Sequence, residues 1–478
     1  MRIRRTSAAV TLAGAIAVAG SVAVNPAPGA AGESATDSAS ISPELSQALR
    51  QTGAQQVVVT FDGEGAPERA DVTALRDAGV ETGITLRSLP IAGVLASDAE
   101  VETLADDPRV RSLYLNERLR YDNDDYTELT GVDAVRRDRA LTRANGGLPV
   151  TGDGVGVVVN DSGIDGTHQD LEYPEHTVQN VEAAANLNSF EPSLLPITYV
   201  EDVPNTDSTG GHGTHVAGIV GATGEKSGGK YEGVAPGADL VGYGSGAGLL
   251  LLDVLGGFDY ALTHQRQYDI RVVTNSWGDS GDTCTKVDPD DPINVATKDA
   301  YDRNIVVVFS AGNSGPDKCT ITGNYKKAPW VIAVAAGNRN EKLAEFSSRG
   351  TAGGGGSFRV DGQRWTWKDQ PTLTAPGVNV VSTRTASPVG VIGAEEDLKR
   401  IDPADLPYYT TLSGTSMAAP HVAGAVALML ETNPELRPGQ VKRILAGTTT
   451  DMPGYAAWQT GTGYVDVHAA VKRAASLR

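Results

Sequence analysis

Cysteine and aromatic residues are scarce in this sequence. Its 478 residues include two cysteines, Cys284 and Cys319, which are too few for a disulfide scaffold or a four-cysteine zinc site. Aromatic residues make up 5% of the chain, whereas glycine occurs 56 times. We therefore expect many tight turns and close backbone contacts instead of a large aromatic core, and at most one disulfide bond.

Positive charge is also in short supply. Forty Lys and Arg residues stand against 59 Asp and Glu residues, which gives a formal net charge of −19. Such a field repels nucleic acids and anionic membranes, so neither is an expected partner. Hydrophobic residues at 40% and charged residues at 21% exclude a wholly disordered or collagen-like chain, and the length favours two or three domains.

Long apolar runs are confined to the N-terminus. Residues 1–5 carry three arginines, residues 8–24 are uncharged, and small residues follow. This pattern predicts a signal peptide over residues 1–31, because a membrane anchor needs about 20 strongly apolar residues. We expect a secreted, extracellular protein with no membrane association after signal removal. In that oxidising setting Cys284 and Cys319 can pair, and two unpaired thiols are the alternative.

A small domain is predicted after a Gly/Ala/Ser-rich spacer at residues 32–42. Residues 43–122 contain strand-like and helix-like runs in the order β-α-β-β-α-β, which predicts a small α+β domain of the split-βαβ, ferredoxin-like type. The runs lie at 56–61, 69–78, 83–86, 91–95, 101–104 and 110–115. No nucleophile clusters with a base here, so the domain has a binding or folding role. The acidic residues 122–126 predict an exposed junction.

Apolar strand-like runs alternate with helical segments from residue 130 onward. Strands are predicted at 155–160, 240–243, 272–275, 305–310 and 331–335, and helices at 212–223, 252–262, 297–301 and 416–430. Strands that are apolar throughout are typical of a parallel sheet covered on both faces. We therefore expect an α/β domain over residues 130–478.

The first of three conspicuous blocks is a run of valines that ends in a carboxylate. Valines occupy 157–159, and Asn160, Asp161, Ser162 and Gly163 follow. A buried strand with this ending puts Asp161 at the sheet edge where ligands bind in open α/β folds. Asp-Ser-Gly is also an ordinary turn sequence, so the block alone leaves both interpretations open.

The second block centres on His212, which has a glycine on either side. These glycines clear space around the imidazole and make His212 a candidate exposed base. His215 lies three residues later, where packing or a helix-end hydrogen bond is its expected role. A paired-histidine zinc site is the alternative, but the His-Glu-x-x-His pattern is absent.

The third block places Ser416 in the first turn of an alanine-rich helix. A serine there has an exposed hydroxyl and unpaired backbone N–H groups beside it. A simple helix N-cap is the alternative. His421 follows five residues later, about 140° around the helix, so we assign it a structural role.

Together these blocks resemble the subtilisin-like serine peptidases, the subtilases. Asp161, His212 and Ser416 occur in the chain order that subtilisin uses for its catalytic triad. The resemblance covers about residues 152–470 and implies a subtilisin-like three-layer α/β fold with a mostly parallel sheet. It also implies a monomeric serine endopeptidase that hydrolyses polypeptides without a cofactor. Ser416 would be the nucleophile, His212 the base, and Asp161 its orienting partner.

The resemblance extends to the small domain and to the substrate cleft. Residues 43–122 are similar to the family's propeptide, which implies an autoprocessed proenzyme with its own intramolecular inhibitor. Asn313 matches the oxyanion-hole donor. The remaining matches are two segments lining the primary specificity pocket, Ser276-Trp277-Gly278 and Ser310-Ala311-Gly312, and a substrate-pairing edge, Gly246-Ala247-Gly248.

Several features depart from the family pattern. Insertions are expected at 189–207, 351–370 and 386–407, and Trp277 is bulkier than the expected aliphatic residue. Asp170 matches one ligand of a structural calcium ion, but the partner loop at 222–231 lacks the Asn-rich pattern of that site.

Two other classes of function remain open. A metal-dependent hydrolase would use Asp161, His168, Asp170 and His212 as mixed ligands, although they complete no recognised spacing. A non-catalytic binding protein on the same fold is the second, since fold does not imply function. The complete Asp-His-Ser set argues against it.

Overall fold

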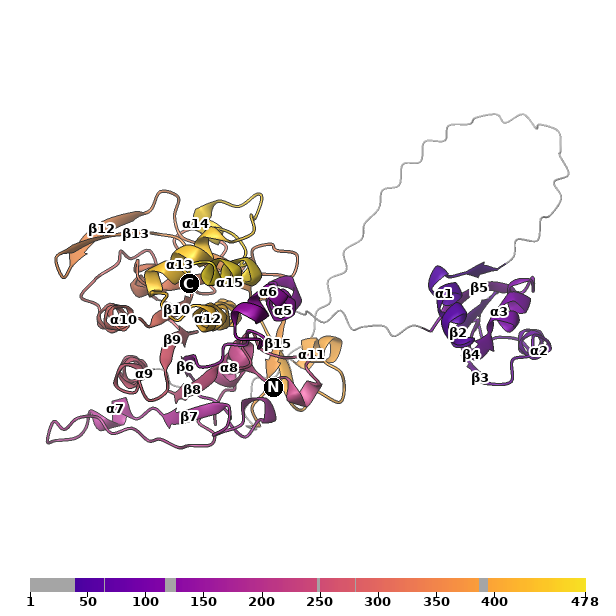
Figure 1. Cartoon of the computed structure of the whole chain (residues 1–478), viewed down its shortest axis with the longest axis horizontal. Coiled ribbons are helices and arrows are strands. Elements are labelled where there is room, and N and C mark those ends of the chain that lie inside the picture. Colours follow the sequence, from indigo (N-terminus) through magenta and orange to yellow (C-terminus); the bar gives the residue numbers. More distant parts are fainter. Residues whose placement is uncertain (1–38, 64, 117–125, 247–249, 280, 387–393) are drawn as a thin grey trace, which may run out of the picture. The chain divides into compact units, whose positions relative to one another are not determined.

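The computed structural model describes residues 39–63, 65–116, 126–246, 250–279, 281–386 and 394–478. The chain divides into an N-terminal unit, Met1–Leu119, and a C-terminal unit, Arg120–Arg478. The two units are coloured by sequence in Figure 1. The predicted signal peptide, most of the spacer and nearly all of the acidic junction lie outside the described residues.

The N-terminal unit is a five-stranded sheet in the order β1-β5-β2-β4-β3. Its strands are β1 (Ser40–Ile41), β2 (Ala54–Phe61), β3 (Gly83–Thr85), β4 (Ile91–Ser97) and β5 (Val110–Leu115). Its helices are α1 (Pro43–Thr52), α2 (Arg69–Asp77) and α3 (Asp98–Ala105). The run from β2 to β5 has the predicted β-α-β-β-α-β order. Only β1 and α1 were not anticipated, although Ser42 caps α1 and Pro43 opens it.

Alternation along the strands gives this sheet one buried face. Val57, Val59 and Phe61 of β2 are buried in the core of the unit, while Val58 between them is only half-buried. Leu95 of β4 and Tyr114 of β5 leave about half of their surface exposed, at 51% and 53%. The face opposite the core therefore carries exposed apolar side chains.

The C-terminal unit is built on a seven-stranded sheet in the order β14-β11-β10-β9-β6-β8-β7, with every pairing parallel. The strands are β6 (Gly156–Asp161), β7 (Thr177–Glu182), β8 (Asp239–Gly244), β9 (Ile270–Asn275), β10 (Val306–Ser310), β11 (Ile332–Gly337) and β14 (Leu373–Pro376). This confirms the predicted parallel sheet. Strands β7 and β14 at its two edges were not predicted.

Helices cover both faces of this sheet and complete three layers (Figure 1). Val157 and Val159 of β6 share a core with α8 (His212–Gly221) and α12 (Thr415–Thr432). Val158 points to the other face and shares a core with α9 (Leu251–Thr263) and α10 (Pro292–Asp302). Valines that are buried on both faces explain why the strand reads as a continuous apolar run.

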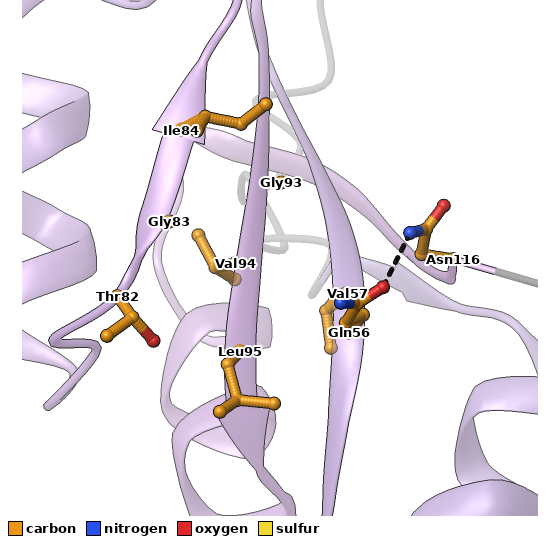
Figure 2. A pocket seen from close by; sticks show the side chains of 9 residues that line it. All are labelled: Gln56, Val57, Thr82, Gly83, Ile84, Gly93, Val94, Leu95 and Asn116. Carbon is orange, nitrogen blue, oxygen red and sulfur yellow. Dashed lines mark hydrogen bonds between the residues drawn. The ribbon is translucent and has the colours of Figure 1, made fainter.

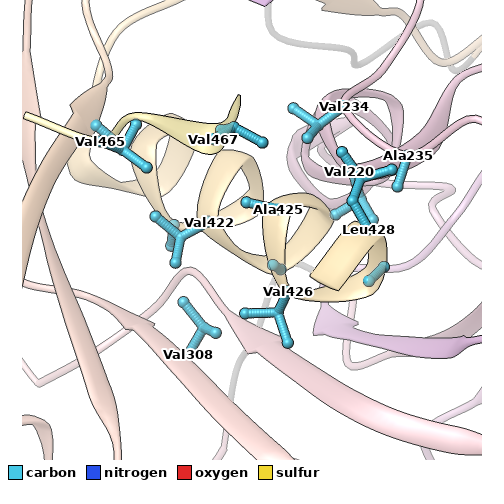
Figure 3. Close-up of a cluster of buried hydrophobic side chains, with 14 of the residues drawn as sticks. Val220, Val234, Ala235, Val308, Val422, Ala425, Val426, Leu428, Val465 and Val467 are labelled. Atoms are coloured by element: carbon cyan, nitrogen blue, oxygen red, sulfur yellow. The ribbon is translucent and has the colours of Figure 1, made fainter. Parts of the chain in front are cut away.

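Helix α12 runs through the middle of its layer. Every residue of α12 except Ser416 and Glu431 is buried. Figure 3 shows Val422 and Val426 on the side of Val308 in the sheet, with Leu428 near Val220 of α8. Its many alanines and Gly424 allow this close packing, since a Cβ on Gly424 would lie 2.6 Å from Val234.

Smaller elements complete the C-terminal unit. The helices are α4 (Tyr126–Leu129), α5 (Val132–Arg137), α6 (Arg139–Ala144), α7 (Ala185–Asn188), α11 (Ala394–Arg400), α13 (Pro438–Gly447), α14 (Ala457–Thr460) and α15 (Val467–Ala475), with 3₁₀ turns η1 (Gln169–Leu171), η2 (Glu225–Ser227) and η3 (Asn324–Lys327). Two antiparallel pairs are β12 (Gly355–Val360) with β13 (Gln363–Lys368), and β15 (Val380–Thr383) with β16 (Tyr409–Leu412). No helix among the described residues is long and apolar enough to cross a bilayer.

Candidate active site

Asp161 and His212 meet at the C-terminal edge of the parallel sheet. Asp161 is the last residue of β6 and His212 the first of α8. A hydrogen bond of 2.6 Å links His212 Nδ1 to Asp161 Oδ1. Because the carboxylate can only accept, Nδ1 carries the proton and Nε2 keeps a free lone pair. Asp161 is buried, whereas a third of the His212 side chain is exposed.

The glycines that flank His212 are required by close packing. Gly211 has φ +73°, and a Cβ there would lie 2.6 Å from Thr385. A Cβ on Gly213 would lie 2.2 Å from the carbonyl oxygen of Gly163, which follows β6. Helix α8 can therefore bring its first residue against the end of β6 only because both positions lack side chains.

A second buried carboxylate, Asp207, holds the start of α8. It accepts hydrogen bonds from the N–H groups of Gly211 and Thr214 at 2.9 Å each, and from the hydroxyls of Thr214 and Ser162 at 2.6 and 3.1 Å. Asp207 was not predicted as a site residue because it falls at the end of the expected insertion at 189–207. An acidic residue just before a predicted helix start was the available signal.

The electrostatic environment of His212 favours its protonated form. Burial alone would lower the pKa of the imidazole, but the charge of Asp161, the hydrogen bond to it and the charge of Asp207 outweigh burial. The pKa of His212 is therefore raised above its ordinary value. This arrangement stabilises an imidazolium ion when the ring takes up a proton.

Ser416 is the second residue of α12 and remains partly exposed. Its hydroxyl donates to the carbonyl oxygen of Ser276 at 3.0 Å, and the Ser276 hydroxyl donates back to the carbonyl of Ser416 at 2.8 Å. In this structure the Ser416 hydroxyl is thus directed to Ser276, just after β9, and not to His212.

Asn313 lies beside the start of α12 with a fixed side-chain amide. Its Oδ1 accepts hydrogen bonds from the N–H and the hydroxyl of Thr415, both at 2.9 Å. These two bonds decide which way the amide faces, so its Nδ2 donor points away from Thr415. Asn313 is exposed, and its N–H₂ group is available to a ligand at the N-terminus of the helix.

The two predicted pocket segments follow neighbouring strands. Ser276–Gly278 directly follow β9, and Ser310–Gly312 start at the last residue of β10, which pairs with β9 in parallel. The indole of Trp277 turns back to donate to the carbonyl of Asn160 at 2.8 Å and packs against Phe309. The bulk of Trp277 therefore lies against the end of the sheet.

The predicted substrate-pairing edge is described only in part. Ser245 and Gly246 donate their N–H groups to the carbonyls of Asp161 and Ser162, at 2.9 and 3.1 Å. This segment, which comes directly after β8 in the chain, therefore lies beside the end of β6. Ala247 and Gly248 lie outside the described residues.

The residues around Asp170 do not fit a calcium ion. One carboxylate oxygen of Asp170 accepts the N–H of Lys226 at 2.8 Å, and the other accepts the hydroxyl of Tyr409. Both oxygens of this fully buried side chain are thus engaged by donors. The described part of the chain contains no group of three or more His, Cys, Asp or Glu side chains able to hold a metal ion.

The other histidines in the three blocks have structural partners. His168 uses its ring nitrogens for the carbonyl of Tyr408 and the N–H of Asp170, so it does not join His212 in a mixed metal site. His215 bonds the carbonyls of Val380 and Thr410, and burial lowers its pKa to about 3. His421 bonds the carbonyl of Met417 within its own helix.

The two cysteines are bonded to each other. Cys284 and Cys319 have Cα atoms 4.9 Å apart and close a loop with a sequence separation of 35. The loop contains α10 and β10, and therefore ties the segment after β9 to the segment after Asn313.

Comparisons with known proteins identify the family of this chain. The sequence profile of the subtilase family, Peptidase_S8, matches residues 152–465. The chain is 33% identical over 362 residues to the serine protease AprX of Bacillus subtilis, covering 72% of this chain and 71% of that protein. It is 32% identical over 348 residues to subtilisin DY of Bacillus licheniformis, covering 72% of this chain and 98% of the relative.

A solved structure extends the comparison to the fold. Sphericase superposes with a TM-score of 0.51 at 27% identity, covering 70% of this chain and 96% of that chain. The seven-stranded sheet, the sequence profile and the subtilisin relatives lead to one conclusion: the chain belongs to the subtilase family and is a serine-type endopeptidase.

Proposed function

We propose that Ser416, His212 and Asp161 form the catalytic triad of this endopeptidase. The observation that carries the proposal is the 2.6 Å bond between Asp161 and His212 Nδ1, which leaves Nε2 as the basic nitrogen. For attack, the Ser416 hydroxyl turns from the Ser276 carbonyl to Nε2. Its proton passes to Nε2 while Oγ bonds to the scissile carbonyl carbon.

The acyl transfer then proceeds in two halves. The protonated His212 donates its proton to the leaving amine, which breaks the peptide bond and leaves an ester on Ser416. A water molecule, deprotonated by the same Nε2, attacks that ester and releases the acid. Asp161 keeps its negative charge throughout and stabilises the imidazolium, in accord with the raised pKa of His212.

The oxyanion of each tetrahedral intermediate would bind to Asn313 Nδ2 and to the backbone N–H of Ser416. Thr415 supports this role because its two hydrogen bonds to Asn313 Oδ1 fix the orientation of the amide before substrate binds. A donor that is already oriented needs no reorganisation when charge develops.

We further propose that the N-terminal unit is a propeptide that inhibits the C-terminal unit of the same chain. Its sheet leaves one face uncovered, where Leu95 and Tyr114 are half exposed and Ile84 is 68% exposed. Figure 2 shows the hollow on this unit, where Ile84 of β3 and Gly93 and Leu95 of β4 belong to the uncovered face. An exposed apolar face of this kind favours a protein partner, and covalent linkage makes the C-terminal unit the partner at highest local concentration.

Secretion and self-processing complete the proposal. The predicted signal peptide would direct export, and the C-terminal unit would then cut the chain between the two units. Because substrate and enzyme are one molecule, the rate constant of this cleavage should not depend on enzyme concentration.

The decisive experiment labels the nucleophile. The wild-type chain and Ser416→Ala are expressed in a host without other extracellular proteases and treated with a fluorophosphonate. Wild type should be labelled at Ser416 and trimmed at its N-terminus, whereas Ser416→Ala should remain an unlabelled precursor. Labelling of another serine would overturn the triad, and trimming of Ser416→Ala would overturn self-processing alone.

The inhibitor role has its own matched pair of variants. Leu95→Asp puts charge on the exposed face of the N-terminal sheet, and Thr103→Asp puts the same charge on an exposed position of α3. Leu95→Asp should shorten the delay between processing and full peptidase activity. Equal delays in the two variants would contradict docking through this face.

A further inference from the structure

One buried lysine lies against the segments that follow β9 and β10. Lys326 belongs to η3 and is 2% exposed. Its ammonium group donates to the hydroxyl of Thr322 at 3.0 Å. A Cβ built on Gly278 would lie 2.3 Å from this Nζ atom, so the ammonium sits directly against the Gly278 backbone.

Thr322 lies similarly close to the backbone of the segment at the end of β10, at Gly312. A Cβ on Gly312 would lie 2.6 Å from its hydroxyl oxygen, and its N–H donates to the carbonyl of Ala311 at 3.2 Å. Thr322 and Lys326 therefore contact both segments, one through Gly312 and the other through Gly278. These contacts are possible only because both glycines lack side chains.

The same two segments hold the nucleophile. The carbonyl of Ser276 accepts the hydroxyl of Ser416, and the N–H of Gly312 donates to the hydroxyl of Thr415. The substrate residue whose carbonyl Ser416 attacks would place its side chain between these two segments. That side chain would then extend from Ser416 towards Lys326. Gly278 is itself exposed, so the ammonium lies just beneath a surface that solvent reaches.

The hydrogen-bond acceptor of the Lys326 ammonium group differs from those of the other lysines that are buried or half-buried. Buried Lys327 donates to the carbonyl of Thr285, buried Lys298 to the carboxylate of Asp302, and half-buried Lys442 to two carbonyls. Lys326 has one neutral hydroxyl for three N–H donors. Burial alone lowers its pKa, to about 7, with no contribution from a carboxylate. A buried cation without a counter-charge is costly, which favours an anionic partner supplied from outside.

We propose that Lys326, assisted by Thr322, closes the primary specificity pocket and selects an acidic side chain, glutamate above all, at the residue whose carbonyl Ser416 attacks. The inference rests on the proposed triad and names the substrate class of that site. The substrate carboxylate would accept hydrogen bonds from the N–H groups of Lys326 that have no acceptor among the described residues. Charge-assisted hydrogen bonds of this kind are about twice as strong as neutral ones.

The test compares peptide nitroanilides that differ only in the residue before the scissile bond: Glu, Gln and Phe. Because Glu and Gln have the same shape, the ratio of their kcat/KM values isolates the charge. At about pH 7 the wild-type, self-processed enzyme should favour Glu over Gln at least tenfold. Lys326→Met keeps the length of the side chain and should bring the ratio to one or below.

Lys327→Met is the matched control. Lys327 is the next residue in η3 and is also buried, but its ammonium group donates a hydrogen bond to the carbonyl of Thr285. This variant should keep the wild-type Glu/Gln ratio. If Lys326→Met fails to fold, the wild-type ratio alone still decides the question.

The outcomes separate this inference from the proposed function. A wild-type enzyme that is labelled at Ser416 and cleaves all three peptides, yet prefers Gln or Phe to Glu, would overturn the inference and leave the triad standing. An equal loss of Glu preference in Lys326→Met and Lys327→Met would also overturn it. An enzyme that is not labelled at Ser416 would overturn the triad, and the inference with it.

Discussion

Replacing Asp207 with asparagine should lower both the stability of the protein and the pKa of His212, the proposed catalytic base. The Asp207 carboxylate accepts four hydrogen bonds, two of them from Thr214. In Asp207→Asn an N–H₂ group would face Thr214, whose hydroxyl can rotate to accept but whose N–H cannot. One buried donor is left unpaired, which costs about 1–3 kcal/mol of unfolding free energy.

The effect on activity follows from the charge that is lost. Asp207 is one of the groups that raise the pKa of His212, and asparagine is neutral. With His212 as the proposed base, peptide hydrolysis requires its neutral form, so activity should rise with pH as the imidazole loses its proton. A lower pKa in Asp207→Asn should therefore move the acidic midpoint of the kcat/KM profile to lower pH.

Two assays and one control separate these effects. Urea unfolding is measured in the Ser416→Ala background, where autolysis is absent, and pH profiles are measured in the active enzyme. Asp397→Asn is the control, because Asp397 is also buried and accepts the N–H of Thr411 and the hydroxyl of Thr410. Asp397→Asn should lose comparable stability without a shift in the acidic midpoint of the kcat/KM profile. If that pH midpoint stays in place or moves to higher pH in Asp207→Asn, the reasoning is refuted.

Three further predictions concern the oxyanion hole, the disulfide and metal ions. Asn313→Ala removes one donor of the proposed oxyanion hole and should reduce kcat by about 10²–10³ with little change in KM, whereas a change confined to KM would assign Asn313 to substrate binding. Replacing Cys284 and Cys319 by serine releases the loop they close and should cost about 3–4 kcal/mol in urea unfolding, and an unchanged midpoint would mean that the pair does not constrain the unfolded chain. A chelator should leave the melting temperature of the Ser416→Ala chain unchanged, and a large drop would show a metal site apart from Asp170.

The parallel sheet and the placement of Asp161, His212 and Ser416 at the ends of its elements could be predicted because each signal is local. Asp161, His212 and Ser416 all lie at the junction between a glycine-containing turn and a strand or helix that is apolar along its length. A valine run and an alanine-rich helix need no distant partner to be recognised. For the same reason the predicted bounds of β6, α8 and α12 differ from the observed ones by no more than two residues.

What could not be predicted depends on partners far apart in the chain. Asp170 was considered as a calcium ligand, but its second oxygen accepts the hydroxyl of Tyr409, 239 residues away. Lys326 reads as an ordinary surface lysine until tertiary contacts bury it against Gly278. Strand β7 contains Gln179 and Asn180, which hide its buried positions from an analysis of apolar runs.

The burial of α12 has a consequence for the lifetime of the enzyme. Ser416, the proposed nucleophile, is carried by a helix whose other residues, except Glu431, are all buried, so local fraying should not displace it while the rest of the unit stays folded. Loss of activity on heating should then follow the rate of global unfolding, and amide protons in the middle of α12 should be among the last to exchange. For a protease surrounded by copies of itself, this coupling makes the height of the unfolding barrier, more than the equilibrium stability, the quantity that limits self-digestion.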